Sequence, residues 1–290
     1  MTEGVASLAG DAGLGRRLGR AARAAARATE LVASTAGLAG IYEAHARLSG
    51  LSGSRAGEAG PTRADGVPSP SGSARREALL DRYRRLWAAG MLHTGATATV
   101  LAAPVPAPAH GPRLVVANHR SMLDIPVLLR LFGGNFLGLA ELAEWPMLGQ
   151  AARMAGVVFV DRTDQASRVS ALRAVRRLLD TGATVIVFPE GTTFPGDEVR
   201  PFNPGAFLVG ADVELVPVGL AYDDPTVEYG DEGFVEHASR IGRRRRTRVS
   251  VAVGSPIDAA RRPRSARALA ELARDQVQSL VRAARPHINP

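Results

Sequence analysis

The sequence predicts an α/β fold in which a mostly parallel or mixed central sheet is flanked by helices. From Arg113 onward, short apolar runs alternate with segments of helical periodicity, an order typical of parallel sheets with helical connections. The runs are apolar throughout, as expected for strands that are covered on both faces. With 290 residues, of which 46% are hydrophobic, the chain can bury a core as one large domain, with or without an appendage.

The first 73 residues differ in composition from the rest and are predicted to form two segments. Residues 1–48 are rich in alanine and arginine, which favour a helical arm. Five arginines precede an apolar run in this arm, so it has the composition of a helix that lies on an anionic membrane. A solvated or disordered arm fits this composition equally well. Residues 49–73 contain repeated Gly, Ser and Pro and are predicted to be a linker, which leaves residues 74–290 as the main domain.

The main domain is expected to begin with a helix over residues 75–92, where large apolar side chains recur at helical spacing. An extended segment over residues 97–103 and a loop over residues 104–112 follow. The predicted strands are Leu114–Ala117, Val157–Val160, Thr184–Phe188, Leu215–Leu220 and Arg248–Val253. An amphipathic helix is expected before the third strand and stops near Gly182, and a last helix covers residues 265–284.

Composition and charge exclude several classes of function. The formal net charge is +8, and every one of the 36 basic residues is an arginine. Residues 240–290 contain 13 arginines against 3 acidic residues, a charge of +10, which leaves −2 for residues 1–239. No cysteine is present, which excludes disulfides, thiolate metal sites and a thiol nucleophile.

The run Arg243–Arg246 lacks the aromatic residues and recognition motifs that accompany nucleic-acid binding. It is interpreted first as a solvated turn and second as a contact with anionic lipid. We therefore expect no nucleic-acid partner.

No segment is predicted to cross a membrane, because a spanning helix needs about 20 mostly apolar residues. The nearest candidate, residues 86–103, is uncharged but contains Gly90, His93, Gly95 and three threonines. A secretory signal is not expected either. We expect the protein to lie on the cytoplasmic side of the cell membrane.

The candidate catalytic pair is His119 and Asp124, in the segment Asn-His-Arg-Ser-Met-Leu-Asp at residues 118–124. His119 follows a predicted buried strand in a loop that leads to a helix, where α/β sheets gather functional groups. In a regular helix these two positions would point about 140° apart, so they meet only if a turn intervenes. Pro126 supports such a turn, with Asp124 as N-cap and the proline in the first helical turn. The alternative is that Ser121 and Asp124 form only a capping box.

A second motif, Phe-Pro-Glu-Gly-Thr-Thr at residues 188–193, follows a predicted apolar strand. At a strand end, Gly191 permits close backbone approach, and Glu190 offers a hydrogen-bond acceptor for a hydroxylated ligand. Taken alone, the motif is also compatible with an ordinary turn.

Together, the two motifs resemble those of the glycerolipid acyltransferase family, which includes the lysophosphatidic acid acyltransferases. The family's block of a histidine, four residues and an aspartate is similar to residues 118–124. Its later blocks are similar to residues 156–162, 188–192 and 216–218, in the same order. The resemblance covers roughly residues 80–255 and leaves the first 73 residues outside it.

The resemblance implies transfer of an acyl group from an acyl-CoA or acyl carrier protein to a lysolipid hydroxyl, with no bound cofactor and no metal. His119 would be the general base, and Asp124 would hold its imidazole in the right tautomer. No acyl-enzyme is expected, and the chain lacks a Gly-x-Ser-x-Gly elbow. The implied substrate-binding residues are Arg162, Glu190, Gly191, Thr192 and Thr193. The expected partners are the lysolipid, the thioester donor and a membrane surface that the protein contacts peripherally.

Some of these assignments have alternatives. Arg162 is equally well explained by a structural ion pair at a strand end. For the whole protein, the alternative from another class is a noncatalytic lipid-binding or membrane-adaptor protein that retains the fold. The intact pair of His119 and Asp124 argues against it.

Two departures from the family pattern concern the acceptor. Members that bind phosphate usually have an arginine where this chain has Thr193, and a lysine at the position of Leu139. Two missing cations remove charge-assisted bonds of about 1.5–3 kcal/mol each. The acceptor is predicted first as a 1-acyl-sn-glycerol-3-phosphate-type lysolipid, with another arginine such as Arg200 replacing the missing ones. The alternative is a different lysolipid, such as a lysophospholipid with a larger head group or a lyso-aminolipid.

Overall fold

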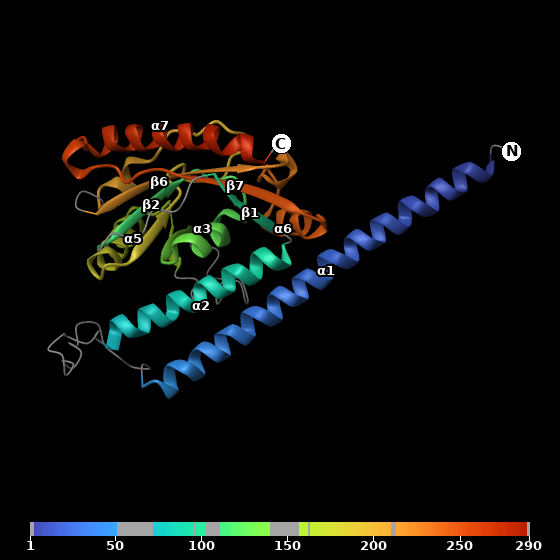
Figure 1. The fold of residues 1–290 in the computed structure, drawn as a ribbon, viewed down its shortest axis with the longest axis horizontal. Helices are drawn as coiled ribbons and strands as arrows, with labels where there is room; N and C mark the ends of the chain where they lie inside the picture. Colours follow the sequence, from blue (N-terminus) through green and yellow to red (C-terminus); the bar gives the residue numbers. More distant parts are fainter. Residues whose placement is uncertain are drawn as a thin grey trace.

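The computed structural model describes residues 3–50, 72–95, 97–102, 111–139, 157–161, 163–209 and 213–288. These residues form a seven-stranded sheet with helices packed against it (Figure 1), which confirms the predicted fold class. In spatial order, the strands are β1 (Thr97–Leu101), β7 (Thr247–Val253), β6 (Glu214–Tyr222), β2 (Arg113–Ala117), β5 (Thr184–Val187), β3 (Asn135–Leu139) and β4 (Val157–Val160). Neighbouring strands are parallel except for β6 and β7, which are antiparallel.

All five predicted strands are present, and the extended segment predicted before them is β1. Strand β3 has no predicted counterpart, because Gly133 and Gly134 precede it and Gly138 interrupts its apolar run. It nevertheless pairs with both β5 and β4. Gly134 has a φ of +83°, and a Cβ there would lie 2.3 Å from the carbonyl oxygen of Thr184. Glycine is therefore required where β3 approaches β5.

The helices are α1 (Glu3–Leu48), α2 (Gly72–Thr94), α3 (Asp124–Phe132), α5 (Gln165–Asp180), α6 (Phe234–Arg243) and α7 (Ala266–Ala284). The predictions that correspond to α1, α2, α5 and α7 are confirmed. Helix α6 was not predicted, because only Phe234, Val235 and Ile241 are large apolar residues among its 10 residues. It lies beside the loop that contains His119, because its His237 bonds to Ser121 of that loop.

The core lies on the two faces of the sheet. On β2, Leu114 and Val116 face one side and pack in a cluster with residues of α5 and α7. Val115 and Ala117 face the other side and pack with residues of α2 and α3. All four side chains are fully buried, as the continuous apolar run of this strand predicts.

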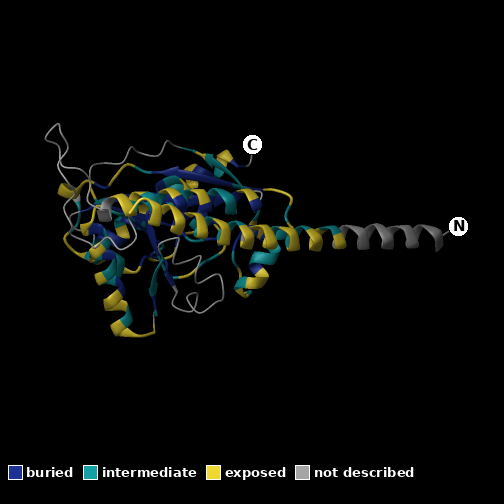
Figure 2. Cartoon of the chain, turned by 90° about the horizontal axis from the view of Figure 1, so that it is seen from below, coloured by how far each residue is buried: buried dark blue, intermediate teal, exposed yellow. Residues whose placement is uncertain are grey.

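The long helix α1 packs along α2 and also contacts α6, and its N-terminal part extends beyond the sheet and its helices (Figure 1). The indole N–H of Trp87 on α2 donates to the Thr35 hydroxyl at 3.0 Å. Tyr42 packs edge-on against Tyr83 with 5.5 Å between ring centroids. Much of the described surface of α1 is nevertheless exposed (Figure 2).

Two predicted segments fall largely outside the described residues, namely most of the linker (residues 51–71) and the loop at residues 103–110. Among the helices that the structure describes, none is long and apolar enough to cross a bilayer.

Candidate active site

The polar residues predicted for the site meet at one edge of the sheet. Strands β6, β2 and β5 are adjacent and parallel, so their carboxyl ends lie together. His119 follows β2, Glu190 follows β5, and Tyr222 is the last residue of β6. This is the edge at which open α/β sheets bind ligands.

His119 and Asp124 are in direct contact. The His119 Nδ1 lies 2.8 Å from Asp124 Oδ2. The contact is possible because residues 118–123 form a loop and turn before α3 begins at Asp124. The predicted turn between the two residues is therefore confirmed.

The carboxylate of Asp124 is fully buried and accepts hydrogen bonds on both oxygens. Besides the contact with His119, Oδ2 accepts from the backbone N–H groups of Arg120 at 2.6 Å and Ser121 at 2.8 Å. Oδ1 accepts from the Tyr222 hydroxyl at 2.6 Å. A buried carboxylate is costly unless its oxygens are bonded, and here both oxygens of Asp124 have partners.

The prediction that Asp124 is an N-cap was wrong by one position, since Leu123 is the N-cap of α3 and Asp124 is its first residue. The side chain of Asp124 turns back to the loop, where it accepts from Ser121 N–H as in a capping box. Asp124 thus fixes the loop and the histidine together, so the structural and catalytic interpretations are compatible.

Tyr222 was not singled out from the sequence. Burial raises the pKa of its hydroxyl well above the ordinary value, and the negative charge of Asp124 raises it further. The hydroxyl therefore stays protonated and donates to Asp124 at neutral pH.

The imidazole of His119 has one nitrogen bonded to Asp124 and one without a bond to any described residue. Its ring stacks on Phe188, with centroids 4.1 Å apart and planes inclined by 15°. The side chain is 18% exposed, and no described residue bonds to Nε2. Because Asp124 accepts, the network assigns the proton to Nδ1 and leaves a lone pair on Nε2. This is the arrangement that a general base requires.

Glu190 faces inward and makes a buried ion pair. Its Oε2 lies 2.8 Å from the Arg120 guanidinium, and neither side chain is more than 1% exposed. The same oxygen accepts from the backbone N–H of His119 at 2.7 Å, and Oε1 accepts from that of Arg200 at 2.9 Å. The carboxylate therefore joins the two segments that surround the histidine. Because both oxygens of Glu190 bond inside the protein, Glu190 would contribute to substrate binding by holding the backbone of His119 and Arg200 in position.

Arg120 is buried with all its polar contacts inside the protein. Besides Glu190, it donates to the carbonyl oxygens of His119 at 2.8 Å, Gly196 at 2.5 Å and Glu198 at 2.8 Å. Such a charge is tolerated because each donor has an acceptor. Arg120 was not predicted to have a role, since the sequence does not distinguish a buried arginine from a surface one.

Three of the predicted substrate residues, Gly191, Thr192 and Thr193, lie in the turn after β5. Gly191 has a φ of +87°, which favours glycine. Thr192 is exposed and Thr193 is half-buried, and neither hydroxyl bonds to another described residue. Arg162 lies outside the described residues, as does the side chain of Leu139. The roles of these residues stay predictions.

Arg200 lies against the segment that is bonded to the catalytic loop. Its guanidinium carbon is 4.8 Å from the centroid of the Phe194 ring, a cation–π contact. The backbone N–H of Phe194 in turn donates to the His119 carbonyl oxygen at 3.1 Å. The Arg200 side chain is bonded to no acidic residue among those described, so its charge is available to a ligand.

Two further residues hold the loop in place. The Asn118 amide bonds to the backbone of Leu220 through both its nitrogen, at 2.9 Å, and its oxygen, at 2.8 Å. His237 on α6 is fully buried, and its Nε2 accepts from the Ser121 hydroxyl at 3.2 Å. Burial lowers the pKa of His237, although its Nδ1 lies 2.9 Å from Glu232. Its neutral form is therefore favoured, and no sequence pattern marks it.

No group of three or more His, Asp and Glu side chains that could hold a metal ion occurs within the described part of the chain. The arrangement of the site is that of acid–base chemistry at a histidine.

Comparisons with known proteins agree with this geometry. An acyltransferase family model matches residues 99–221. A lyso-ornithine lipid O-acyltransferase from Pseudomonas aeruginosa is 36% identical over 181 residues, which cover 60% of this chain and 67% of that protein. A 1-acyl-sn-glycerol-3-phosphate acyltransferase from Neisseria meningitidis is 36% identical over 124 residues, 42% of this chain and 49% of the relative. The match to this second relative thus spans about half of its length.

The fold is also shared with a solved structure. The 1-acyl-sn-glycerophosphate acyltransferase PlsC from Thermotoga maritima aligns with a TM-score of 0.61 and 20% sequence identity. The alignment covers 90% of this chain and 98% of the other, and at this identity it supports the fold alone. On the family model and the relatives together, the chain belongs to the acyltransferase family that includes 1-acyl-sn-glycerol-3-phosphate and lyso-ornithine lipid acyltransferases.

Proposed function

We propose that this acyltransferase moves a fatty acyl group from an acyl-CoA or acyl carrier protein thioester to the free hydroxyl of a lysolipid. The observation that carries the proposal is the contact of His119 with Asp124. The Nδ1 of the histidine is fixed by a fully buried carboxylate, and no residue that the structure describes bonds to Nε2.

In this mechanism, Nε2 of His119 removes the proton of the lysolipid hydroxyl as its oxygen attacks the thioester carbonyl carbon. The new C–O bond gives a tetrahedral intermediate. Its collapse breaks the C–S bond, and the imidazolium returns its proton to the leaving thiolate. A positioned base of this kind typically contributes about 10² to 10⁴-fold to the rate.

Asp124 acts on this reaction through the imidazole. It favours the tautomer with the proton on Nδ1 and stabilises the imidazolium that forms during attack. The Tyr222 hydroxyl and the backbone N–H groups bonded to Asp124 keep the carboxylate in one orientation. Arg120 and Glu190 hold the backbone of His119 from the opposite side. The base is thus fixed before substrate binds.

For the acceptor, we propose a lysolipid whose head group offers one carboxylate in place of a phosphate, as that of a lyso-ornithine lipid does. Thr193 supplies no cation where phosphate-binding members usually have an arginine. Arg200 offers one guanidinium beside the His119 loop, which suits bidentate contact with a carboxylate. The Pseudomonas aeruginosa relative, whose name gives this acceptor, matches over 67% of its length.

A 1-acyl-sn-glycerol-3-phosphate acceptor is the second candidate. It is favoured by several relatives of that name, including one from Neisseria gonorrhoeae at 36% identity. In that case Arg200 would contact the phosphate in place of the arginine that is absent at position 193.

We also propose that the protein works at a membrane surface, on the cytoplasmic side, because its lysolipid acceptor is a bilayer component. Helix α1 exposes large apolar side chains, with Ile41 57% and Leu48 89% exposed. Such a helix suits an interfacial position. Deletion of residues 1–73 should lower the fraction recovered with membranes, and unchanged recovery would show that the arm is dispensable for attachment.

The test of the proposed function is a donor and acceptor panel with purified protein. Palmitoyl-CoA and palmitoyl carrier protein are each offered with lyso-ornithine lipid, 1-acyl-sn-glycerol-3-phosphate and lysophosphatidylcholine. We expect wild-type product to be greatest with lyso-ornithine lipid. The His119→Ala variant should lose about 10² to 10⁴-fold in rate.

The matched control is His287→Ala, which removes an exposed histidine near the C-terminus. It should retain the wild-type rate. Equal product from wild type and His119→Ala would refute the mechanism, and a strong preference for 1-acyl-sn-glycerol-3-phosphate would refute the first choice of acceptor.

A further inference from the structure

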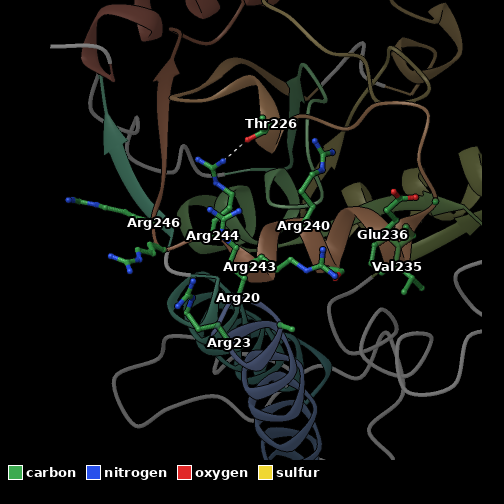
Figure 3. Close-up of a pocket in the computed structure, with 14 residues that line it drawn as sticks. Arg20, Arg23, Thr226, Val235, Glu236, Arg240, Arg243, Arg244 and Arg246 are labelled. Atoms are coloured by element: carbon green, nitrogen blue, oxygen red, sulfur yellow. Dashed lines mark hydrogen bonds between the residues drawn. The ribbon is translucent and has the colours of Figure 1, made fainter. Parts of the chain in front are cut away.

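A groove lined by arginines lies between α1 and α6, apart from the candidate active site. Its volume is about 1580 Å³, and its lining comes from α1, from α6 and from the loop after α6 (Figure 3). The charged residues of the lining are Arg20, Arg23, Arg240, Arg243, Arg244, Arg245, Arg246 and Glu236. Seven arginines against one glutamate give this lining a formal charge of +6. We call it the arginine groove.

Most of this positive charge has no partner within the described protein. Two arginines are paired, since Arg244 contacts Asp224 at 2.8 Å and Arg240 contacts Glu232. The exposed arginines without a hydrogen bond or ion pair to another described residue are Arg20, Arg243, Arg245 and Arg246. The Nε of Arg23 is buried without a hydrogen-bond partner. Like charges gathered in this way repel one another, so an anionic partner would stabilise the groove.

The size and shape of the arginine groove favour a protein partner. Small-molecule sites typically measure about 300–1,000 Å³, which is less than this groove. Helix α1 forms one wall and α6 the other, so the groove is concave, whereas lipid head groups present a plane. An apolar side chain is also available, because Val235 lines the groove and is 65% exposed. An acidic helix that projects from a partner protein matches this concave, basic and partly apolar surface.

The arginine groove is linked to the catalytic loop through α6 and the segment before it. His237, on the same helix as Arg240, bonds to Ser121 in the catalytic loop. Arg240 donates to the Glu228 carbonyl oxygen at 2.9 Å, and the Glu228 carboxylate accepts from Gly196 N–H at 2.5 Å. The Gly196 carbonyl in turn accepts from Arg120, the neighbour of His119. A chain of hydrogen bonds through Glu228 and Gly196 therefore connects the groove with the catalytic loop.

We propose that the arginine groove docks an acidic acyl carrier protein, whose phosphopantetheine arm delivers the thioester to His119. This inference rests on the proposed acyl-transfer function and assigns its donor. The formal charge of +6 on the groove lining would also raise the association rate with an acidic carrier protein. Complementary charge has this effect most strongly at low salt.

The test reverses charge on each wall of the groove. One variant combines Arg245→Glu with Arg246→Glu in the loop after α6, and a second is Arg20→Glu on α1. The matched control combines Arg168→Glu with Arg173→Glu, two exposed arginines on α5. Two readouts are measured, the KM for palmitoyl carrier protein in acyl transfer and the Kd for the holo carrier protein by calorimetry.

Both groove variants should raise the KM and the Kd for the carrier protein by about 10-fold, with kcat at saturating donor close to wild type. The α5 control should match the wild type. The wild-type Kd should weaken with added salt, and this salt dependence should be smaller in the groove variants. Because calorimetry needs no turnover, the groove is tested even if acyl transfer to every lysolipid fails.

Three results would overturn the carrier-protein assignment. The first is an unchanged Kd and KM in both groove variants. The second is an equal rise of KM for palmitoyl-CoA, which would assign the groove to the phosphates that the two donors share. The third is loss of binding to anionic phosphatidylglycerol vesicles with an unchanged Kd for the carrier protein, which would assign the groove to the membrane.

Discussion

The protein has two regions rich in charge, and they differ in how that charge is compensated. Behind His119, the side chains of Asp124, Arg120 and Glu190 are buried, and each is bonded to partners inside the protein. In the arginine groove, four exposed arginines have no bonded partner among the described residues. The first region therefore fixes the position of His119, whereas the second is suited to bind an external anion.

Substitutions in these two regions are therefore expected to have different consequences. Removal of one partner in the buried region leaves another charge or donor uncompensated, so both rate and stability should suffer. Removal of an exposed, unpaired arginine leaves nothing uncompensated, so the fold should be unaffected and only binding should change.

Asp124→Asn should lower the acyl-transfer rate by about 10² to 10⁴-fold. The amide has one oxygen where the carboxylate has two, so it cannot accept from His119, Tyr222 and two backbone N–H groups together. The measurement is kcat with the best lysolipid of the panel. Asp180→Asn, which alters an exposed ion pair with Arg176, is the control and should keep the wild-type rate. A wild-type rate in Asp124→Asn would show that Asp124 does not orient the histidine.

Glu190→Gln should reduce the free energy of unfolding by about 3–5 kcal/mol, because it leaves the Arg120 charge buried without its counter-ion. The matched control is Glu271→Gln, which breaks the exposed pair with Arg267. That change should cost less than about 1 kcal/mol. Chemical denaturation of the two variants measures the difference, and equal losses would contradict the distinction between buried and exposed charge.

Arg200→Gln should raise the KM for the lysolipid acceptor by about 10-fold, since it removes one charge-assisted contact with the head group. Its stability should equal that of wild type, because the guanidinium is exposed on the Phe194 ring. Arg177→Gln on α5, also exposed, is the control. If the KM for every acceptor is unchanged, Arg200 is not part of the head-group site.

His237 should make stability depend on pH. Burial lowers its pKa in the fold, so below the unfolded value of about 6.5 the unfolded chain binds the proton more readily. The stabilising contribution of neutral His237 is therefore complete above about pH 6.5 and is lost as the pH falls below it. Protonated Nε2 can no longer accept from Ser121, while Glu232 and Arg240 face Nδ1.

The measurement for His237 is the Tm of wild type and His237→Gln between pH 8 and pH 5. Wild type should be the more stable at pH 8, and the gap should narrow as the pH falls. A gap that stays constant or widens toward acid would show that His237 is not neutral in the fold.

The turn that brings His119 to Asp124 and the positions of five strands along the chain could be predicted from the sequence, because both depend on local pattern. The spacing of His119 and Asp124 and the position of Pro126 indicated the turn that joins them. Strand β3 was not predicted, because the glycines in and before it interrupt the apolar pattern of a strand. Its extended conformation depends on pairing with β5, which is distant in the sequence.

The residues that bond to the catalytic loop and to Asp124 could not be predicted, because their contacts join distant parts of the chain. Glu190 lies 70 residues from Arg120, Tyr222 lies 98 residues from Asp124, and His237 lies 116 residues from Ser121. A glutamate after a strand indicates a polar group at the sheet edge. Only the fold shows that this carboxylate turns inward to the arginine beside the histidine.

The most direct test of the central claim, that Asp124 acts through His119, is a double-variant cycle on kcat/KM. The rates of wild type, His119→Ala, Asp124→Asn and the double variant are measured with one donor and one acceptor. Residues that act as a unit are not additive, so the double variant should be no slower than His119→Ala alone. If the fold-losses in kcat/KM of the two single variants multiply in the double variant, Asp124 does not act through His119 and has a role independent of it.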